Sequence, residues 1–174
     1  MEFVSLFSTL GVDVTVVEML PKILGPMDEE LSTELQQAFE KRKVKFHLST
    51  KVTAVRDGKV IAEHEGEQLE IPFDKLLVSV GRRAVTDGLG LETVGVELNR
   101  GAIVVDEHLE TSVPGIYAVG DVNGVSMLAH TAAREGQVAV HHITDYPDAM
   151  SYRAIPGIVY TDPEIASVGK TEQE

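Results

Sequence analysis

The sequence predicts an α/β protein built on an incomplete, doubly wound parallel sheet, with an antiparallel meander inserted behind it. Two patterns carry this prediction: amphipathic helices alternate with apolar, β-branched strands over residues 2–48, and three short strands separated by turn residues follow over residues 52–71. Parallel strands are joined through crossovers, which are usually helices, whereas antiparallel strands need only a tight turn. The two patterns therefore indicate two kinds of sheet in one chain.

The chain has 174 residues, with 15 Lys and Arg against 28 Asp and Glu, a net charge of −13 and a hydrophobic fraction of 43%. This hydrophobic fraction is sufficient for a substantial core in one domain or two small ones. The acidic excess repels nucleic-acid phosphates and anionic lipids, so neither nucleic acid nor a membrane is expected as a partner.

Cysteine is absent from the chain. The chain therefore has no disulfide, no cysteine ligand for zinc and no thiol of its own for catalysis. No apolar run reaches the roughly 18 residues of a membrane span, and the first residues lack the basic start of a secretory signal. A cytoplasmic protein is expected.

The chain is expected to open with a helix over residues 2–10. The apolar residues of this segment recur at spacings of three and four, and Gly11 stands where the helix would end. Residues 12–18 follow as an apolar, β-branched run, which is typical of a strand covered on both faces.

A second helix is expected to begin at Asp28, whose carboxylate can cap it, with a buried stripe of Leu31, Leu35 and Phe39. Residues 44–48 then alternate apolar and polar side chains, as a strand does. The order helix, strand, helix, strand is that of half a doubly wound unit.

The meander is expected to consist of short strands at 52–55, 60–62 and 69–71. Asp57-Gly58 between the first two is a strong signal for a two-residue hairpin turn. Another apolar strand is expected at 76–80, ending in Gly81-Arg82-Arg83. The elements expected after a glycine-rich loop are strands at 102–105 and 116–119, a helix at 128–143, and strands at 158–160 and 165–168.

Glu18 stands at the carboxyl end of an expected strand. In a dinucleotide-binding unit such an acid accepts hydrogen bonds from the adenosine ribose, about 20 residues after a glycine-rich turn. That turn would precede Met1, and no matching fingerprint occurs elsewhere in the chain. An ordinary strand-end acid is the alternative.

Asp121 follows Gly120 at the tip of an expected strand, where glycine permits close approach of a ligand and the acid can bind a polyol hydroxyl. Met127-Leu128-Ala129-His130 opens the next helix, whose positive end suits an anionic acceptor. The alternatives are a simple Gly-Asp turn and a core-facing helix start.

Metal binding is not expected. Of His130, His141 and His142, the last two point to different faces of the expected helix at 128–143, and no acid of that helix completes a set at i+4 spacing. Arg82 and Arg83 could bind a phosphate as a fork, but two arginines after a strand are more often a solvated loop.

Five stretches together resemble the flavin-dependent pyridine-nucleotide disulfide oxidoreductases, in that family's order. The stretches are 14–18, 77–83, 111–121, 127–130 and 160–169. Within the family, the Met-Leu-Ala-His stretch followed by Glu135-Gly136 is similar to the dihydrolipoamide dehydrogenases more than to the glutathione or mercuric reductases.

The resemblance implies two cofactors, NAD and FAD. It implies that Glu2 lies at the nicotinamide end of NAD, that Glu18 binds the adenosine ribose, and that Val52 and Gly81 line the NAD site. For FAD, it implies that Asp121 binds the ribitol. The residues that it implies under the flavin ring are Met127, Leu128, Ala129 and His130.

The resemblance also implies three parts. These are a partial, Rossmann-like NAD-binding domain at 1–84, the returning segment of an FAD-binding domain at 85–150, and the start of a dimer-interface domain at 151–174. The family's redox-active cysteine pair and its His-Glu pair have no counterpart in this chain. We therefore expect an internal fragment with cofactor-binding residues, no catalytic residue and no activity of its own.

The parent enzyme implied by the resemblance is a homodimer that oxidises the dihydrolipoyl groups of a 2-oxo acid dehydrogenase complex with NAD through FAD. One alternative is another member of the family, such as an NADH oxidase or a mercuric reductase. A different class of alternative is a non-catalytic nucleotide-binding or interaction module.

A last expectation concerns the sheet. In the implied topology a strand that the chain lacks lies between the strands at 12–18 and 76–80. Unpaired edges are costly, so we expect these two strands to pair directly or the slot to be filled by another segment or a second copy.

Overall fold

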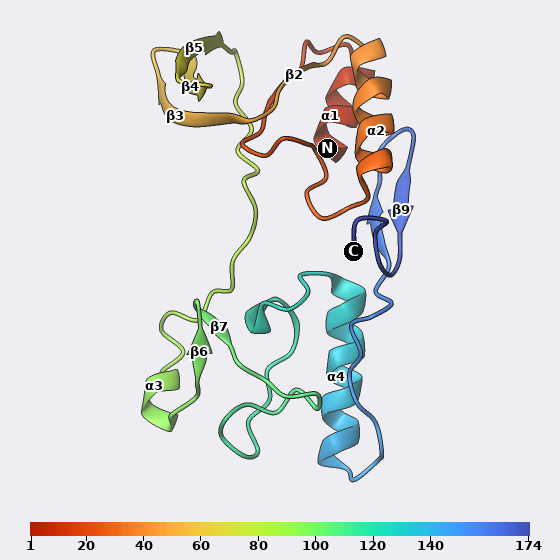
Figure 1. Ribbon diagram of the computed structural model, residues 1–174. Helices are drawn as coiled ribbons and strands as arrows, with labels where there is room; N and C mark the ends of the chain where they lie inside the picture. Colours follow the sequence, from red (N-terminus) through yellow and green to blue (C-terminus); the bar gives the residue numbers. More distant parts are fainter. The chain divides into compact units, whose positions relative to one another are not determined.

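The computed structural model describes residues 1–174, which form two compact units (Figure 1). The first unit consists of Met1–Leu77 together with Ala154–Glu174, and the second of Val78–Arg153. The units are groups of contacts within this chain, and the three-part division at residues 84 and 150 stays a prediction.

The first unit opens with helix α1 (Glu2–Thr9), strand β1 (Thr15–Val17), helix α2 (Glu29–Lys41) and strand β2 (Lys45–His47). Strands β1 and β2 pair in parallel, with Val16 opposite Phe46. Helix α2 is the crossover between them, so these three elements form one βαβ unit.

Helix α2 begins where the sequence predicts. Asp28 is its N-cap, and the Asp28 carboxylate accepts a hydrogen bond from the backbone N–H of Glu30 at 3.0 Å. Leu35 and Phe39 on its inner face are fully buried, and Leu31 packs against the same cluster. The buried residues of this core are Ile23, Leu35, Phe39, Val44 and Ile165.

The end of the chain packs into this first core. Strands β8 (Gly157–Val159) and β9 (Ile165–Ser167) form an antiparallel hairpin, and Ile165 of β9 is a core residue. The hairpin connection is tied to helix α1, because the Ser5 hydroxyl accepts a hydrogen bond from the Asp162 N–H at 3.1 Å.

A three-stranded antiparallel sheet follows β2. Its strands are β3 (Thr50–Arg56), β4 (Lys59–His64) and β5 (Glu67–Pro72), in that order across the sheet. Asp57 and Gly58 join the first two strands with φ values of +52° and +70°. Both positive values are what a type I′ hairpin turn requires, and Gly58 supplies one of them without steric cost.

The strand expected at 76–80 is wrong: these residues form no strand and join no sheet. Val78 and Val80 are 68% and 93% exposed. The expected pairing of 76–80 with 12–18 is likewise not formed, since β1 pairs only with β2. A two-sided apolar strand needs hydrogen-bonding neighbours, and none of the strands present in the chain supplies one.

The second unit contains a short helix α3 (Leu91–Val94), the two-residue strands β6 (Leu98–Asn99) and β7 (Ala102–Ile103), the 3₁₀ turn η1 (Gly120–Asn123) and helix α4 (Ala129–Ile143). The strand expected at 116–119 is replaced by an isolated bridge between Glu110 and Tyr117. The chain turns back on itself between Glu110 and Tyr117, where the Thr111 N–H donates to the Ile116 carbonyl at 2.8 Å. The strand residues pair there only in isolated bridges and form no continuous ladder.

Two small clusters form the interior of this unit. One contains Val96, Ile103 and Ala118, and the other contains Leu109, Val138 and Ala139.

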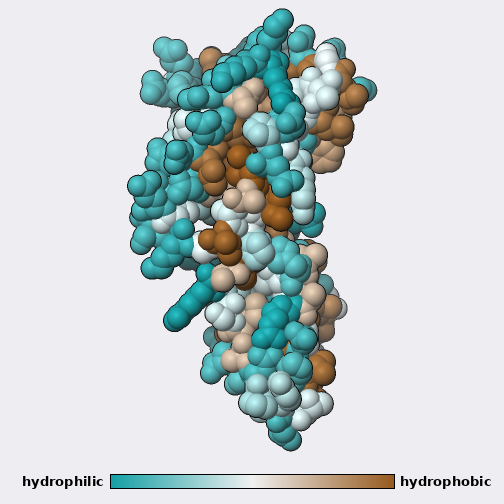
Figure 2. All heavy atoms as spheres, turned by 90° about the vertical axis from the view of Figure 1, so that its right-hand side faces the viewer, coloured by the Kyte–Doolittle hydropathy of each residue, from teal (hydrophilic) through white to brown (hydrophobic).

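Figure 2 shows that hydrophilic side chains cover much of one face of the molecule, with smaller hydrophobic groups between them. No helix in the chain combines the length and the apolar character that crossing a membrane would need.

Candidate functional site

Glu18 follows β1 directly, at the carboxyl end of the strand. Its Oε1 accepts a hydrogen bond from the backbone N–H of Leu20 at 2.9 Å, which fixes the side chain across the turn after the strand. Its Oε2 has no partner in the structure and the residue is partly exposed. The free carboxylate oxygen can therefore accept from a sugar hydroxyl.

Strand β3 starts beside Glu18. The backbone N–H of Thr50 donates to the carbonyl of Glu18 at 2.9 Å, and Val52 lies two residues further along β3 with its side chain 45% exposed. Glu18 and Val52 are thus brought into one neighbourhood of the first unit.

Glu2 lies in the first turn of α1, at the start of the first unit. Its Oε1 accepts a hydrogen bond from the backbone N–H of Tyr160 at 2.9 Å, so half of the carboxylate is engaged by the β8 end of the tail hairpin. Its Oε2 has no partner in the structure.

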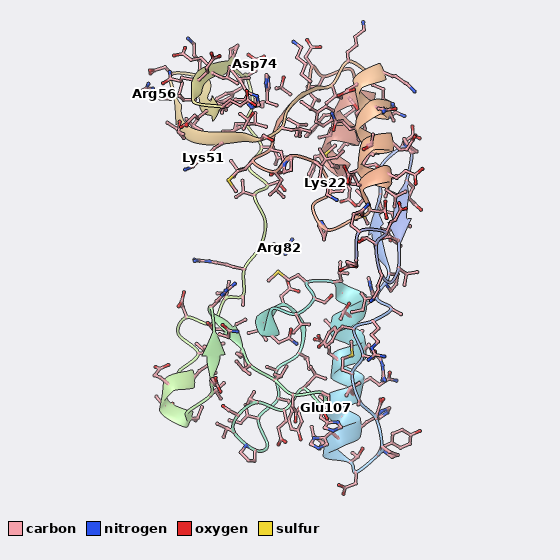
Figure 3. All side chains as sticks on the ribbon, viewed as in Figure 1. Lys22, Lys51, Arg56, Asp74, Arg82 and Glu107 are labelled. Atoms are coloured by element: carbon pink, nitrogen blue, oxygen red, sulfur yellow. The ribbon has the colours of Figure 1, made fainter.

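Gly81 lies in the extended stretch that follows β5. Its φ is +106°, a backbone conformation that residues with a Cβ rarely adopt. A Cβ built at this position would nevertheless meet no atom within 4 Å. Figure 3 shows the neighbouring Arg82 side chain projecting from this stretch. Both residues are exposed, which agrees with a solvated loop in this chain.

The Gly120-Asp121 turn begins η1. Gly120 is buried with φ of +79°, and a Cβ built on it would lie 3.3 Å from the Cβ of Ala132 in helix α4. Glycine is therefore required both for the backbone conformation and for the close approach to the helix. The Asp121 side chain is exposed and has no partner in the structure, so both carboxylate oxygens are available to a ligand.

The Met127–His130 segment leads into α4. Leu128 is the N-cap, and no side chain caps the first turn of this 15-residue helix. An uncapped first turn concentrates backbone N–H groups and the positive end of the helix dipole, which favours an anionic group. The residue before the segment is tied to the first turn of α4, because the Ser126 hydroxyl donates to the Thr131 hydroxyl at 3.0 Å.

A buried glutamate joins these two segments. Glu135 of α4 is fully buried, and its Oε2 accepts the N–H of Gly120 at 2.5 Å. Its Oε1 accepts the hydroxyl of Tyr152 at 2.8 Å. Burial beside this carboxylate raises the pKa of Tyr152 well above its ordinary value, because both make the phenolate unfavourable.

A hollow of about 470 Å³ adjoins the turn within the second unit. Arg83 and Arg100 line it together with Ile103, Asn123 and Met127. The second unit therefore brings the stretch after Gly81 against the segment that follows Asp121.

His141 and His142, two of the three histidines considered above, have different partners. His141 Nδ1 lies 2.7 Å from Asp148 Oδ2, and His142 Nδ1 lies 2.9 Å from the Tyr117 hydroxyl. His108, which sequence reasoning missed, stacks on His142 with ring centroids 4.5 Å apart. No group of three or more His, Asp or Glu is placed to hold a metal ion.

Sequence reasoning also missed the roles of Glu135 and Tyr152. Their partners lie 15 and 17 residues away, so no local periodicity reveals them. The signal that could have found Glu135 is its place on the helix: Thr131, Glu135, Val138 and Ala139 form one face, and that face is buried.

The mixed α/β fold of the chain matches part of solved flavoprotein disulfide reductase structures. Two solved structures show this: LpdA from Mycobacterium tuberculosis, with a TM-score of 0.86 and 33% identity, and the Cu(II) complex of the HOCl-induced RclA from Escherichia coli, with 0.85 and 27%. They cover 99% and 98% of this chain, which corresponds to 38% and 40% of theirs.

Residues 1–136 match the family described as pyridine nucleotide-disulphide oxidoreductase, and the chain belongs to this family. Over its whole length it is 45% identical to dihydrolipoyl dehydrogenase 2, mitochondrial, from Arabidopsis thaliana and 42% identical to dihydrolipoyl dehydrogenase from Halobacterium salinarum. It is also 42% identical to leghemoglobin reductase from Glycine max. The chain spans 36%, 38% and 35% of the lengths of these three relatives.

Proposed function

We propose that the chain is part of an enzyme that oxidises dihydrolipoyl groups with NAD through FAD. The observation that carries this proposal is the 42% to 45% identity, over the whole chain, to proteins named dihydrolipoyl dehydrogenase. In this proposal residues 1–84 belong to a Rossmann-like NAD-binding domain, residues 85–150 to the FAD-binding domain and residues 151–174 to a dimer interface.

In the proposed NAD site, Glu18 accepts hydrogen bonds from the adenosine ribose with its free Oε2. A carboxylate repels a 2′-phosphate, so the same residue favours NAD over NADP. Val52 and Gly81 line this site, and Glu2 lies at the nicotinamide end with one carboxylate oxygen available.

In the proposed FAD site, the unpartnered carboxylate of Asp121 binds the ribitol hydroxyls, which the exposed position of its side chain allows. Met127, Leu128, Ala129 and His130 lie against the ring, where the uncapped first turn of α4 stabilises negative charge. FAD, when bound, carries the electron pair between a dithiol and NAD. The chain's residues hold and orient the cofactors and perform no thiol exchange, since the chain has no cysteine.

The proposal extends to partners and location. A homodimer that accepts the lipoyl domains of a 2-oxo acid dehydrogenase complex is the assembly that this activity requires. A cytoplasmic location stays a prediction: the names of the relatives from Arabidopsis thaliana and Dictyostelium discoideum include "mitochondrial", whereas that of the Halobacterium salinarum protein does not.

The test is a chimera in which this chain replaces the matching segment of the Arabidopsis thaliana dihydrolipoyl dehydrogenase 2. The chimera is expected to bind FAD and to form NADH from dihydrolipoamide and NAD, whereas the chain alone forms none. Absence of both FAD binding and NADH formation in a folded chimera would contradict the proposal.

Another disulfide reductase of the family is the second candidate, and the similarity to RclA favours it. A chimera that binds FAD and oxidises NADH but leaves dihydrolipoamide unchanged would support that candidate. Binding of a nucleotide without any electron transfer would instead point to a non-catalytic nucleotide-binding module.

A further inference from the structure

The second unit has one buried carboxyl group, that of Glu135, and its burial was not predicted from the sequence. It is 0% exposed, and burial of a carboxyl group is costly unless its oxygens are hydrogen-bonded. Both oxygens are bonded here, Oε2 to the Gly120 N–H and Oε1 to the Tyr152 hydroxyl. Two specific hydrogen-bond donors therefore offset the free-energy cost of burying this carboxyl group.

The donor on the Gly120 side is structurally demanding. Gly120 is buried, has φ of +79° and approaches Ala132 so closely that a Cβ would lie 3.3 Å away. Its N–H cannot reach water, and a buried N–H without an acceptor destabilises the conformation that contains it. The Glu135 carboxylate is the acceptor that allows this turn to sit against α4.

The hydrogen bond between Glu135 and Gly120 also affects the exposed residues of η1 and of the segment before α4. Asp121 follows Gly120 directly, and the Met127–His130 segment leads into the helix that carries Glu135. Fixing Gly120 against α4 thus fixes the backbone of Asp121 relative to the uncapped first turn. Asp121, proposed to bind the ribitol, and the Met127–His130 segment, proposed to lie against the flavin ring, therefore form one surface that is arranged before the cofactor binds.

We propose that Glu135 is a positioning residue for flavin binding, acting through its hydrogen bond to Gly120 and without touching the cofactor. This inference rests on the proposed FAD site, and its two halves are tested separately. The position of the turn is measured in the chain without cofactor, and the effect on flavin binding is measured in the chimera.

The variants Glu135→Leu and Glu135→Gln separate the hydrogen bond from the space that the side chain fills. Leucine keeps much of the volume but offers no acceptor to Gly120. Glutamine keeps one acceptor oxygen, which can face the Gly120 N–H while its amide donates to the Tyr152 oxygen. Glu135→Gln should therefore rescue what Glu135→Leu loses.

In the 174-residue chain, the Gly120 amide is expected to exchange with deuterium roughly 10- to 100-fold faster in Glu135→Leu, because its hydrogen bond to the Glu135 side chain is lost. In Glu135→Gln the change is expected to stay within about threefold. Val138→Ala is the matched control: Val138 is fully buried one turn further along α4, so this variant lowers stability without touching the turn.

In the chimera, Glu135→Leu is expected to weaken FAD binding roughly tenfold or more, with NAD affinity unchanged and with Glu135→Gln and Val138→Ala near the unsubstituted protein. Equal Gly120 exchange in all variants would overturn the positioning role. Faster exchange in Glu135→Leu with unaltered FAD affinity would show that the turn is positioned for stability alone. A folded chimera without FAD binding would refute the proposed function and leave the exchange result to decide the structural half.

Discussion

Arg134 and Asp148 form a bidentate ion pair in which Nη1 donates to Oδ2 at 2.7 Å and Nη2 donates to Oδ1 at 2.6 Å. His141 Nδ1 lies 2.7 Å from the same Oδ2, and the Ala149 N–H donates to Oδ1 at 2.9 Å. Asp148 therefore connects the segment after α4 to two side chains of the helix itself. These partners, Arg134 first, hold the pKa of the Asp148 carboxyl well below its ordinary value.

Asp148→Asn is expected to lower the stability of the chain at neutral pH, and the difference from the unsubstituted chain should shrink progressively as the pH falls below about 4. A carboxyl whose pKa is depressed in the folded state contributes stability above its unfolded pKa of about 4 and loses it as the pH falls further. Urea unfolding at pH 7, 5, 4 and 3 measures this. Asp145→Asn, an exposed neighbour without a side-chain partner, should show no such pH-dependent difference; equal profiles for the two variants would count against the ion pair.

Phe39→Ala is expected to lower the free energy of unfolding by about 3 to 5 kcal/mol, because it removes a fully buried ring and leaves a cavity. That is a large part of the roughly 5 to 15 kcal/mol available to a domain. Phe3→Ala makes the same chemical change at a ring that is 53% exposed and should cost less than about 1 kcal/mol. Denaturant unfolding compares the two, and similar losses would place the core elsewhere.

Local signals were sufficient for the elements that depend on neighbours in sequence. The Asp28 carboxylate caps α2 two residues away, and Asp57-Gly58 adopts the positive φ values of a tight hairpin. Leu35 and Phe39 are buried because helical spacing places them on one face. In each case the information lies within a few residues.

The expectations that depend on distant partners were incomplete. The apolar run at 76–80 has the composition of a buried strand, but composition does not say whether neighbouring strands exist, and here the segment is exposed. Glu135 lies on the buried face of its helix, but its two hydrogen-bond donors, Gly120 and Tyr152, are distant in sequence and are brought close only by the fold. The roles assigned to Glu2, Glu18, Val52, Gly81 and Asp121 stay predictions that binding experiments must test.

Glu18→Arg is expected to shift the nucleotide preference of the chimera from NAD towards NADP. The change removes the acceptor for the ribose hydroxyls and offers a guanidinium to a 2′-phosphate, so the ratio of the two dissociation constants should move by roughly 30- to 150-fold, or about 2 to 3 kcal/mol. Titration with each nucleotide measures the ratio.

The matched control for this change is Glu34→Arg. Glu34 is an exposed acid of α2 without a side-chain partner, and its replacement alters the net charge by the same amount. If both variants shift the preference equally, general electrostatics and not contact with the ribose would explain the result.

Lysine substitution at Val78 is expected to reduce self-association of the chain. Residues 75–85 take part in no backbone hydrogen bond, and the side chains of Leu76, Leu77, Val78 and Val80 are between 43% and 93% exposed. An extended apolar segment with free N–H and C=O groups is a template for pairing with another chain, and a lysine within it opposes that pairing. Val78→Lys should therefore shift the mass distribution measured by light scattering towards the monomer.

Val85→Lys adds the same charge beside this segment, at a side chain that is 73% exposed and lies outside the apolar run. It should leave the distribution close to that of the unsubstituted chain, because the template at 76–80 remains intact. Hydrogen exchange adds a second measurement, since pairing protects the amides of residues 76–80 at high protein concentration and leaves them unprotected on dilution. A chain that stays monomeric at every concentration, with these amides always exchanging freely, would show that the exposed segment does not act as an edge.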